Sequence, residues 1–207
     1  MTTLRTEPLR KPAEAHHPIH DLIRERWSPR AFATRTVERA TLLSLFEAAR
    51  WAPSSNNRQP WHFIVATSEH PQDHARLAAT LNERNRRWAQ HAPVLILVVA
   101  QLAPQPGREL ASLYDVGLAV GNLVTQAVAQ GLGTHQLGGF DAEQARAALG
   151  IPAGYAPVAV IALGYPGAPE LLPDDLRLRE LARRTRKPLE AFVFEGQWQL
   201  DAAEVAA

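Results

Sequence analysis

The sequence predicts a single layered domain of the α/β or α+β class. Two short segments, residues 94–100 (VLILVVA) and 158–163 (VAVIAL), are apolar at every position, which is typical of strands covered by helices on both faces. Segments with a helical spacing of apolar residues alternate with them, and this alternation indicates a sheet between layers of helices. The chain has 207 residues, of which 46% are apolar and 21% charged, and a chain of this kind can bury a sizeable core.

The folded domain is predicted to span residues 19–198. Residues 1–18 contain three prolines and mixed charges without a hydrophobic period, so we expect an extended or mobile arm there. Residues 199–207 are expected to form a C-terminal tail. The sequence contains no internal repeat and no low-complexity segment.

In the first half of the domain, a helix is predicted to begin after Thr36, which is a suitable N-cap residue, and to end before Pro53. Residues 61–67 (WHFIVAT) are apolar and partly β-branched, which favours a strand. Residues 72–90 are strongly charged and are predicted to be helical. The apolar stripe of the first of these helices consists of Leu42, Leu45, Phe46 and Ala49.

Residues 94–100 are predicted to form a central strand. A long helix follows over residues 109–130 and ends at Gly131, in the usual place of a C-terminal glycine. A short segment then leads to Asp141, which is expected to cap a further helix that Gly150 closes.

The last part of the domain is predicted to contain two strands and a basic segment. Residues 158–163 form the second fully apolar strand, and residues 175–187 are basic and helical in part. Residues 189–196 (LEAFVFEG) are predicted to form a final strand that lies well away from the others in sequence.

Composition excludes several classes of function. The chain has no cysteine, which excludes disulfides, thiolate-ligated zinc, iron–sulfur clusters and a cysteine nucleophile. Its formal charge of +1 gives no global reason to expect nucleic acid or an anionic membrane as a partner. The longest apolar run is too short to cross a bilayer, and the N-terminus lacks the apolar centre of a signal peptide. We therefore expect a cytoplasmic protein that binds neither nucleic acid nor membranes.

The common catalytic signatures are absent from the sequence. There is no G-x-S-x-G elbow, no G-x-x-x-x-G-K-[ST] loop and no H-E-x-x-H motif. Two histidine pairs, His16 with His20 and His70 with His74, have i, i+4 spacing. Solvated surface histidines explain both pairs better than metal ligands do, because the first pair lies in the predicted arm and Pro71 interrupts the second. We expect no metal site.

Two basic segments carry residues suited to binding an anion. Residues 26–30 (RWSPR) place two guanidinium groups and a hydroxyl on one side of a non-helical stretch, which suits a phosphate. Taken alone, this segment is explained slightly better as a solvated basic turn. Residues 184–188 (RTRKP), taken alone, are typical of a solvated face. A nucleic-acid patch extended by residues 84–88 is the other explanation, and the near-neutral chain argues against it.

Two polar segments carry groups suited to a planar polar ligand. Residues 53–61 (PSSNNRQPW) contain carboxamides that can donate and accept together, which matches the edge of an imide or pyrimidine. An Asn- and Ser-rich turn is the alternative. Residues 137–140 (LGGF) contain paired glycines, which expose backbone N–H groups to a closely approaching molecule. A plain tight turn explains this segment equally well.

Together and in this order, these segments resemble the nitroreductase family of FMN-dependent oxidoreductases. RWSPRAF is similar to the family's R-x-S-x-R-x-F opening, PSSNNRQPWHF to its P-S-x-x-N-x-Q-P-W loop, and GLGTHQLGGFD to its G-L-G…G-F-D turn. ALGYP and TRKPLE match its closing G-Y-P and R-x-P-L-E elements. Five such elements in order over nearly the whole folded length make a specific match.

The resemblance implies a nitroreductase-like α+β fold of three α/β/α layers, with a central, mostly antiparallel sheet flanked by helices. It also implies a homodimer with FMN at the subunit interface and a C-terminal strand, residues 189–196, that extends onto the partner subunit. By position, the cofactor-binding residues are Arg26, Trp27, Ser28, Arg30, Pro53, Ser54, Ser55, Asn57, Gln59, Leu137, Gly138, Gly139, Arg184 and Arg186.

The resemblance also implies how these residues divide the work. The arginines and Ser28 would hold the phosphate and ribityl chain, and residues 54–59 would face the flavin, some of them from the other subunit. The Gly138 N–H would point at flavin N5, and Gly139 would let the ring lie close. Some members carry glutamate where this chain has Gly138, so only the backbone contact carries over.

The chemistry that the resemblance implies belongs to the flavin. NADH or NADPH would deliver hydride to N5, and a small electron-poor acceptor such as a nitroaromatic or a quinone would then take the electrons in a ping-pong reaction. No catalytic side chain is expected, apart from Arg30 as an electrostatic stabiliser of the reduced ring. Two alternatives stay open: a flavin-dependent dehydrogenase or flavin-modifying enzyme that works without NAD(P)H, and a non-catalytic FMN-binding protein.

Overall fold

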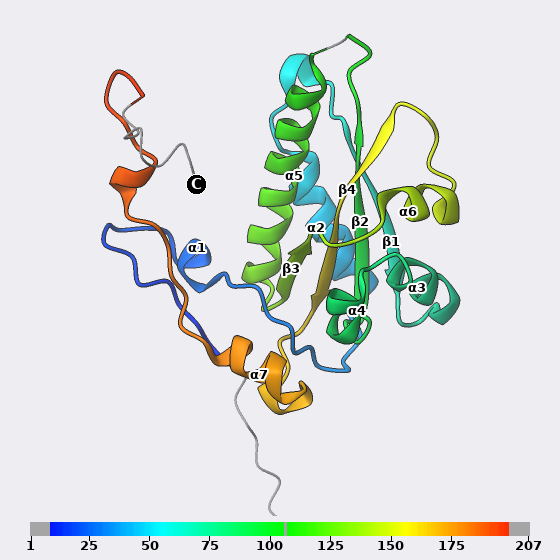
Figure 1. Cartoon of the computed structure of the whole chain (residues 1–207), viewed down its shortest axis with the longest axis vertical. Coiled ribbons are helices and arrows are strands. Elements are labelled where there is room, and N and C mark those ends of the chain that lie inside the picture. Colours follow the sequence, from blue (N-terminus) through cyan, green and yellow to red (C-terminus); the bar gives the residue numbers. More distant parts are fainter. Residues whose placement is uncertain (1–8, 106, 199–207) are drawn as a thin grey trace, which may run out of the picture.

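The computed structural model of the chain describes residues 9–105 and 107–198. A sheet of four antiparallel strands, in the order β1-β2-β4-β3, forms its centre (Figure 1). This arrangement confirms the predicted α+β class and the antiparallel sheet. The strands are β1 (Trp61–Thr67), β2 (Val94–Gln101), β3 (Gly133–Leu137) and β4 (Tyr155–Gly164).

Helices cover both faces of this sheet. Alternate side chains of β2 enter two separate apolar clusters: Leu97 belongs to the cluster shared with one layer of helices, and Ile96 to the cluster shared with the other. The fully apolar pattern of β2 therefore reflects burial on both sides, as predicted. One layer consists of α2 (Arg39–Arg50) and α5 (Glu109–Ala129), and the other of α3 (Pro71–Ala78), α4 (Glu83–Ala89) and α6 (Ala142–Leu149).

Two helix boundaries differ from the prediction. The helix α2 begins at Arg39, with Glu38 at the N-cap position and no side-chain capping bond, so Thr36 is not its cap. Residues 72–90 form two helices, α3 and α4, rather than one. The break between them places Asn82 as the cap of α4, where its side chain accepts the Asn85 N–H. Its own N–H donates to the carbonyl of Gly139, so a long-range contact decides this boundary.

The predicted cap of α6 is confirmed. The Asp141 side chain accepts the backbone N–H of Gln144, and Gly150 ends the helix with a left-handed backbone at φ 65°. Short segments complete the described chain: α1 (Asp21–Glu25), α7 (Asp174–Leu181) and the 3₁₀ turns η1 (Ser55–Asn57), η2 (Pro169–Leu171) and η3 (Leu189–Ala191). Among the described residues, no helix is both long and apolar enough to cross a bilayer.

The predicted strand at residues 189–196 is wrong for the described chain. The segment forms η3 and then bends, and it lies apart from the sheet (Figure 1). A strand needs a neighbour to satisfy its backbone N–H and C=O groups, and the sheet of this chain supplies none there. The side chains of Phe192, Val193 and Trp198 are exposed.

The N-terminal segment lies beside the C-terminal segment (Figure 1). Lys11 Nζ donates to the carbonyl oxygens of Glu180 and Ala182, at 2.6 and 2.5 Å, and Arg183 forms an ion pair with Glu14. These contacts attach the described part of the predicted arm to the end of α7. The rest of the arm, residues 1–8, and the predicted tail, residues 199–207, lie outside the described residues.

Candidate functional site

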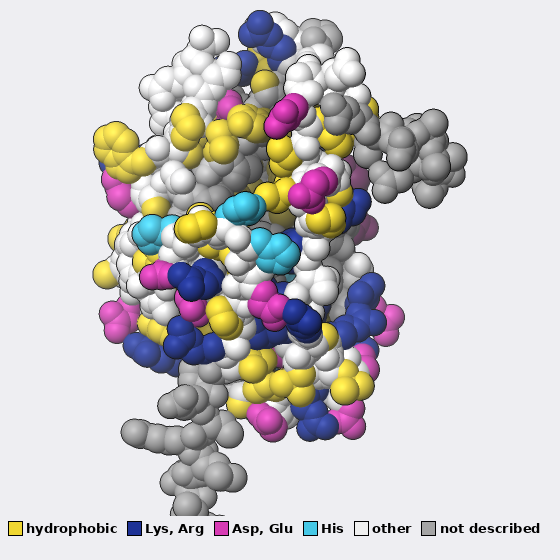
Figure 2. All heavy atoms as spheres, turned by 90° about the vertical axis from the view of Figure 1, so that its left-hand side faces the viewer, with side chains coloured by type: hydrophobic (Ala, Val, Ile, Leu, Met, Phe, Trp, Pro, Cys, Tyr) yellow, Lys and Arg dark blue, Asp and Glu magenta, His cyan; other side chains and the backbone are white. Residues whose placement is uncertain are grey.

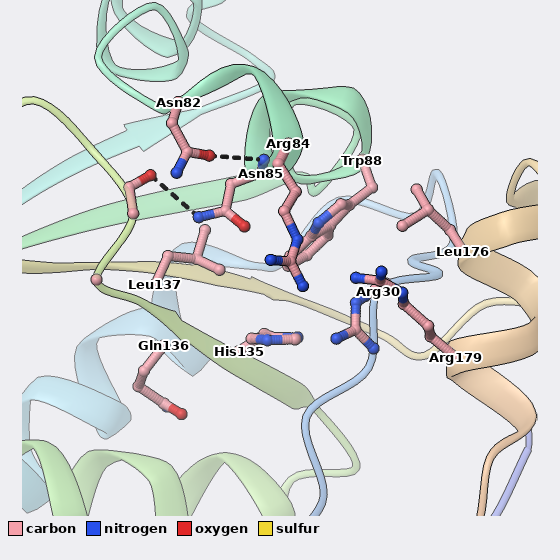
Figure 3. A pocket seen from close by; sticks show the side chains of 12 residues that line it. Arg30, Asn82, Arg84, Asn85, Trp88, His135, Gln136, Leu137, Leu176 and Arg179 are labelled. Carbon is pink, nitrogen blue, oxygen red and sulfur yellow. Dashed lines mark hydrogen bonds between the residues drawn. The ribbon is translucent and has the colours of Figure 1, made fainter. Parts of the chain in front are cut away.

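A cavity of about 330 Å³ lies where the end of β3, the helix α4, the segment of residues 26–30 and the helix α7 meet (Figure 3). This volume falls within the range of small-molecule sites, roughly 300–1,000 Å³. The structure thus brings together four of the predicted site residues from two distant segments. The cavity is lined by Arg30, Asn82, Arg84, Asn85, Trp88, His135, Gln136, Leu137, Gly138, Gly139, Leu176 and Arg179.

One wall of the cavity is a network of carboxamides around Gly139. The Gly139 carbonyl accepts the Asn82 backbone N–H at 3.1 Å and the Asn85 Nδ2 group at 3.0 Å. A Cβ atom at Gly139 would lie 2.4 and 2.5 Å from the Nδ2 atoms of Asn82 and Asn85, whereas one at Gly138 would meet nothing within 4 Å. The lack of a side chain at Gly139 therefore admits the asparagines, and the open space adjoins Gly138.

The opposite wall carries three arginines. Figure 3 shows the guanidinium groups of Arg30, Arg84 and Arg179 turned toward the same space. The Arg30 guanidinium lies 5.9 Å from the centroid of the Trp88 ring, close enough for a cation–π contact. Burial lowers the pKa of Arg30 and the neighbouring Glu180 carboxylate opposes that shift. This wall is suited to an anionic or electron-rich ligand.

His135 forms the floor between these walls (Figure 3) and was not among the predicted site residues. Its ring lies 4.7 Å from the Trp88 ring, and Nδ1 lies 3.0 Å from the carbonyl oxygen of Pro29. Burial lowers the pKa of His135 to about 4, so the ring is neutral at neutral pH. Its position two residues before Leu137 was the available signal, because alternate residues of a strand share a face.

A second group of predicted residues gathers beside the cavity. Arg26 Nη1 donates to Ser28 Oγ at 3.1 Å, and the pKa of Arg26 is lowered by burial and then by the nearby charges of Arg184 and Arg186. Arg184 is held by the carbonyl oxygen of Lys11, to which its Nη1 donates at 2.5 Å. Residues from both ends of the chain therefore form one cationic cluster.

This cationic cluster has no acidic counterpart at Arg26. Arg26 is half-buried, and no Asp or Glu in the described part of the chain forms an ion pair with it. A half-buried cation without a partner is unfavourable unless an anion binds beside it. Figure 2 shows the face that carries the described N-terminal and C-terminal segments, with Lys and Arg side chains, and Asp and Glu between them, across its lower half.

Trp27 lies outside the lining of the larger cavity. Lys11 Nζ is 5.4 Å from the centroid of its ring. The ring lines a smaller cavity of about 190 Å³, together with Arg26 and residues at the end of α5. Neither Trp27 nor its sequence neighbour Arg26 therefore lines the larger cavity.

Within the predicted polar segment at residues 53–61, the loop of residues 53–60 is not brought to the cavity within one chain, and Trp61 begins β1. The loop lies at the N-terminal end of α5, in cyan in Figure 1, whereas α4 and α7 lie toward the other end. Its Pro53, Ser55, Asn57 and Gln59 are exposed and Ser54 is half-buried. The buried Asp115 carboxylate accepts the Ser55 N–H at 3.0 Å, and Ser54 Oγ accepts the Gln59 N–H at 3.0 Å.

The backbone of this loop is strained. Asn56, Asn57 and Gln59 have φ values of 51°, 53° and 50°, in the left-handed region that side chains other than that of glycine rarely occupy. Three such residues in four consecutive positions cost free energy, roughly 1–3 kcal/mol each. The buried Asp115 carboxylate holds the start of this loop through the Ser55 N–H, directly before the strained residues.

The predicted solvated position of His74 is wrong. His74 is buried rather than solvated, and its Nε2 lies 2.8 Å from the carbonyl oxygen of Ala92. It faces inward because α3 packs its apolar stripe, including Leu77, on the sheet. His20, by contrast, is exposed, and its side chain accepts the Leu22 N–H at the start of α1.

Comparison with known proteins agrees with this architecture. A solved structure described as an oxidoreductase containing FMN superposes with a TM-score of 0.83 at 34% identity, covering 90% of this chain and 96% of its own. A 5,6-dimethylbenzimidazole synthase from Rhodospirillum rubrum is 26% identical over 212 residues, 89% of this chain and 97% of its own. An NADH dehydrogenase from Thermus thermophilus is 28% identical over 175 residues, 69% of this chain and 83% of its own.

The sequence model of the family described as Nitroreductase family matches residues 23–165. This match covers more than half of the chain and includes the whole sheet, α4, and the segments around Arg30 and Gly139. The chain therefore belongs to the nitroreductase family.

Proposed function

We propose that this protein is an FMN-dependent NAD(P)H oxidoreductase that reduces small electron-poor acceptors such as nitroaromatics or quinones. The observation that carries the proposal is a cationic cluster, formed by the half-buried Arg26 and Arg184 with the exposed Arg186, beside a cavity walled by carboxamides and arginines. A dianionic phosphate is the ligand that such a cluster fits, because guanidinium groups bind phosphate oxygens in pairs.

The cavity residues fit the ring system of FMN. The side chains of Asn82 and Asn85 present carboxamides, which can pair with alternating C=O and N–H groups of a pyrimidine edge. The open space at Gly138 admits a planar group close to the backbone. A related structure at 34% identity is described as containing FMN. When bound, FMN supplies the hydride acceptor and donor of the reaction.

In this proposal the side chains bind and orient rather than react. Arg26 and Ser28, with Arg184 and Arg186, hold the phosphate, and Arg30 stabilises negative charge that reduction places on the ring. The neutral ring of His135 and the indole of Trp88 form an apolar floor that excludes water from this side of the cavity. The remaining cofactor contacts are assigned to Trp27, Pro53, Ser54, Ser55, Asn57, Gln59, Leu137, Gly138 and Gly139.

A homodimer supplies what one chain lacks. The loop at residues 53–60 is exposed and strained and lies away from the cavity of its own chain. In the proposed dimer, the loop of one subunit lies at the cavity of the other. Exposed apolar residues support such an interface: Leu110 and Tyr114 at the start of α5 are 77% and 69% exposed. The C-terminal segment with Phe192 would lie over the partner subunit.

The visible spectrum of the purified protein under anaerobic conditions tests this proposal. We expect a flavin spectrum that NADH or NADPH bleaches and that a quinone or nitroaromatic restores. Protein that binds no FMN, even after incubation with an excess, would contradict the site assignment. The similarity to an NADH dehydrogenase from Thermus thermophilus supports the use of NAD(P)H.

A second candidate is a reaction on the same flavin site that uses no nicotinamide donor, either dehydrogenation or modification of the flavin. The similarity to a 5,6-dimethylbenzimidazole synthase over 89% of this chain favours this candidate. A bound flavin that neither NADH nor NADPH bleaches would select it over the first proposal. An acceptor screen with chemically reduced protein would then distinguish this second candidate from a non-catalytic FMN-binding protein.

A further inference from the structure

A buried carboxylate holds the segment that carries Arg30. The Glu180 side chain is 1% exposed. Its Oε1 atom accepts the backbone N–H groups of Arg30 and Ala31, at 2.9 and 3.1 Å, and its Oε2 atom lies 3.1 Å from the Arg30 N–H nitrogen. Oε2 is also 3.7 Å from the Arg30 guanidinium. Glu180 therefore contacts both the backbone and the charge of Arg30.

The contact between Glu180 and Arg30 joins residues that lie far apart in the sequence. Glu180 lies on α7, outside residues 23–165 that match the family model. Its backbone carbonyl accepts Lys11 Nζ at 2.6 Å, so the same residue also joins the N-terminal segment to the helix. Among the charges that act on Arg30, Glu180 is the acidic one, and Arg84 and Arg179 are basic.

We propose that Glu180 is a positioning residue that fixes Arg30 at the flavin site and offsets part of its charge, and thereby lowers the reduction potential of the bound flavin. The inference rests on the proposed function. A buried carboxylate that accepts two backbone N–H groups orders the segment around Arg30. Its negative charge also weakens the attraction of Arg30 for an electron-rich reduced ring.

The geometry allows the two effects to be separated by substitution. In Glu180→Gln, the amide oxygen can take the place of Oε1 and keep its two backbone N–H bonds, while the Oε2 contact with the Arg30 N–H and the countercharge of Arg30 are lost. In Glu180→Asp, the charge is kept but the carboxylate is withdrawn by one methylene from Arg30 and Ala31. Glu170→Gln is a matched control, because Glu170 is exposed on η2 and lies outside the cavity lining.

The test measures the flavin midpoint potential by spectroelectrochemistry, and the FMN dissociation constant by fluorescence quenching, on the purified full chain. For Glu180→Gln we expect FMN affinity within about threefold of wild type. We also expect a roughly tenfold greater preference for reduced over oxidised flavin, which for a two-electron couple is about 30 mV more positive. For Glu180→Asp we expect FMN binding weakened by roughly tenfold and a smaller shift in potential. The control should leave both quantities unchanged.

Each outcome decides the inference. A Glu180→Gln protein that binds FMN with an unchanged potential would overturn the charge effect, and unchanged FMN affinity in Glu180→Asp would overturn the positioning role. If Glu180→Gln does not fold, Glu180→Asp still tests positioning, and failure of both variants to fold would assign Glu180 a purely structural role. Failure of wild-type protein to bind FMN would instead overturn the proposed function, so the two failures are distinguishable.

Discussion

His135 Nδ1 lies 3.0 Å from the carbonyl oxygen of Pro29, and this contact joins β3 to the segment that carries Arg26 and Arg30. The carbonyl can only accept, so Nδ1 carries the hydrogen. Pro29 also packs against the start of the same strand, where a Cβ atom at Gly133 would lie 2.4 Å from its Cγ. The floor of the cavity and the cationic cluster are therefore positioned by one junction.

This junction predicts a pH dependence of stability. The pKa of His135 is lowered from 6.5 to about 4 in the folded protein, so the unfolded chain takes up the proton first as the pH falls. The stability contributed by the neutral ring is present above pH 6.5 and is lost progressively as the pH falls toward 4. We expect the loss to reach about 3 kcal/mol at most, measured by urea unfolding at a series of pH values.

The variant His135→Gln isolates this effect from other titrating groups. Glutamine can donate to the Pro29 carbonyl without titrating, so its unfolding free energy should fall less between pH 7 and pH 4 than that of wild type. The exposed His17→Gln is the control and should follow the wild-type curve. Parallel curves for wild type and His135→Gln would contradict the proton linkage at this site.

The cationic cluster predicts a loss of cofactor affinity in the double variant Arg26→Ala, Arg186→Ala. Truncating each charge-assisted contact costs about 1.5–3 kcal/mol, so the two together should weaken FMN binding by at least roughly 100-fold. The control is the double variant Arg50→Ala, Arg76→Ala, which removes two exposed i, i+3 ion pairs. A double cluster variant that purifies with a full complement of FMN would show that the phosphate lies elsewhere.

Asp115 predicts a separate effect on the strained loop. Its buried carboxylate accepts the Ser55 N–H, and Asp115→Ala removes this charge-assisted hydrogen bond, which contributes about 1.5–3 kcal/mol. We expect kcat/KM per bound flavin to fall by roughly tenfold, while the cationic cluster keeps FMN in place. Asp115→Asn keeps an acceptor oxygen and should fall less. Equal activity of the alanine variant and wild type would argue against a role of the loop at the site.

The exposed end of α5 predicts the dimer interface. Tyr114 is 69% exposed, and Tyr114→Glu places a charge where the proposed partner subunit packs. We expect a monomer by size-exclusion chromatography with light scattering, together with reduced FMN content, because the loop of the partner is lost from the cavity. Ala75→Glu on α3 adds the same charge on the opposite face of the sheet and should stay dimeric. A dimeric Tyr114→Glu protein would place the interface elsewhere.

Most elements of this fold could be predicted from local sequence patterns. The central strand β2 was predicted because burial on both faces requires apolar side chains at every position, and that requirement is visible in seven consecutive residues. The cap at Asp141 and the left-handed end of α6 at Gly150 were also predictable from local sequence. Each depends on hydrogen bonds or dihedral angles within a few residues.

The arginines of the cationic cluster were predicted only through the resemblance to a family. Alone, residues 26–30 and 184–188 are typical of solvated basic turns. Their convergence depends on contacts across the whole chain, such as the bond from Arg184 to the Lys11 carbonyl. The pattern of a short motif predicts which residue types are present, whereas burial and charge pairing arise only when distant segments pack.

The sequence by itself therefore determined the strands β1 and β4 of the sheet around the central β2, and two of the segments that line the candidate cavity, around Arg30 and Gly139. Only the tertiary structure decided that Glu180, in a helix whose charges look solvent-exposed, is buried against the backbone of Arg30. It likewise placed His135 and Trp88 under the cavity and left residues 189–196 without a strand neighbour. The physical reason is that helix and strand periodicity is local, whereas satisfying a buried charge or an unpaired backbone requires partners that lie far away in sequence.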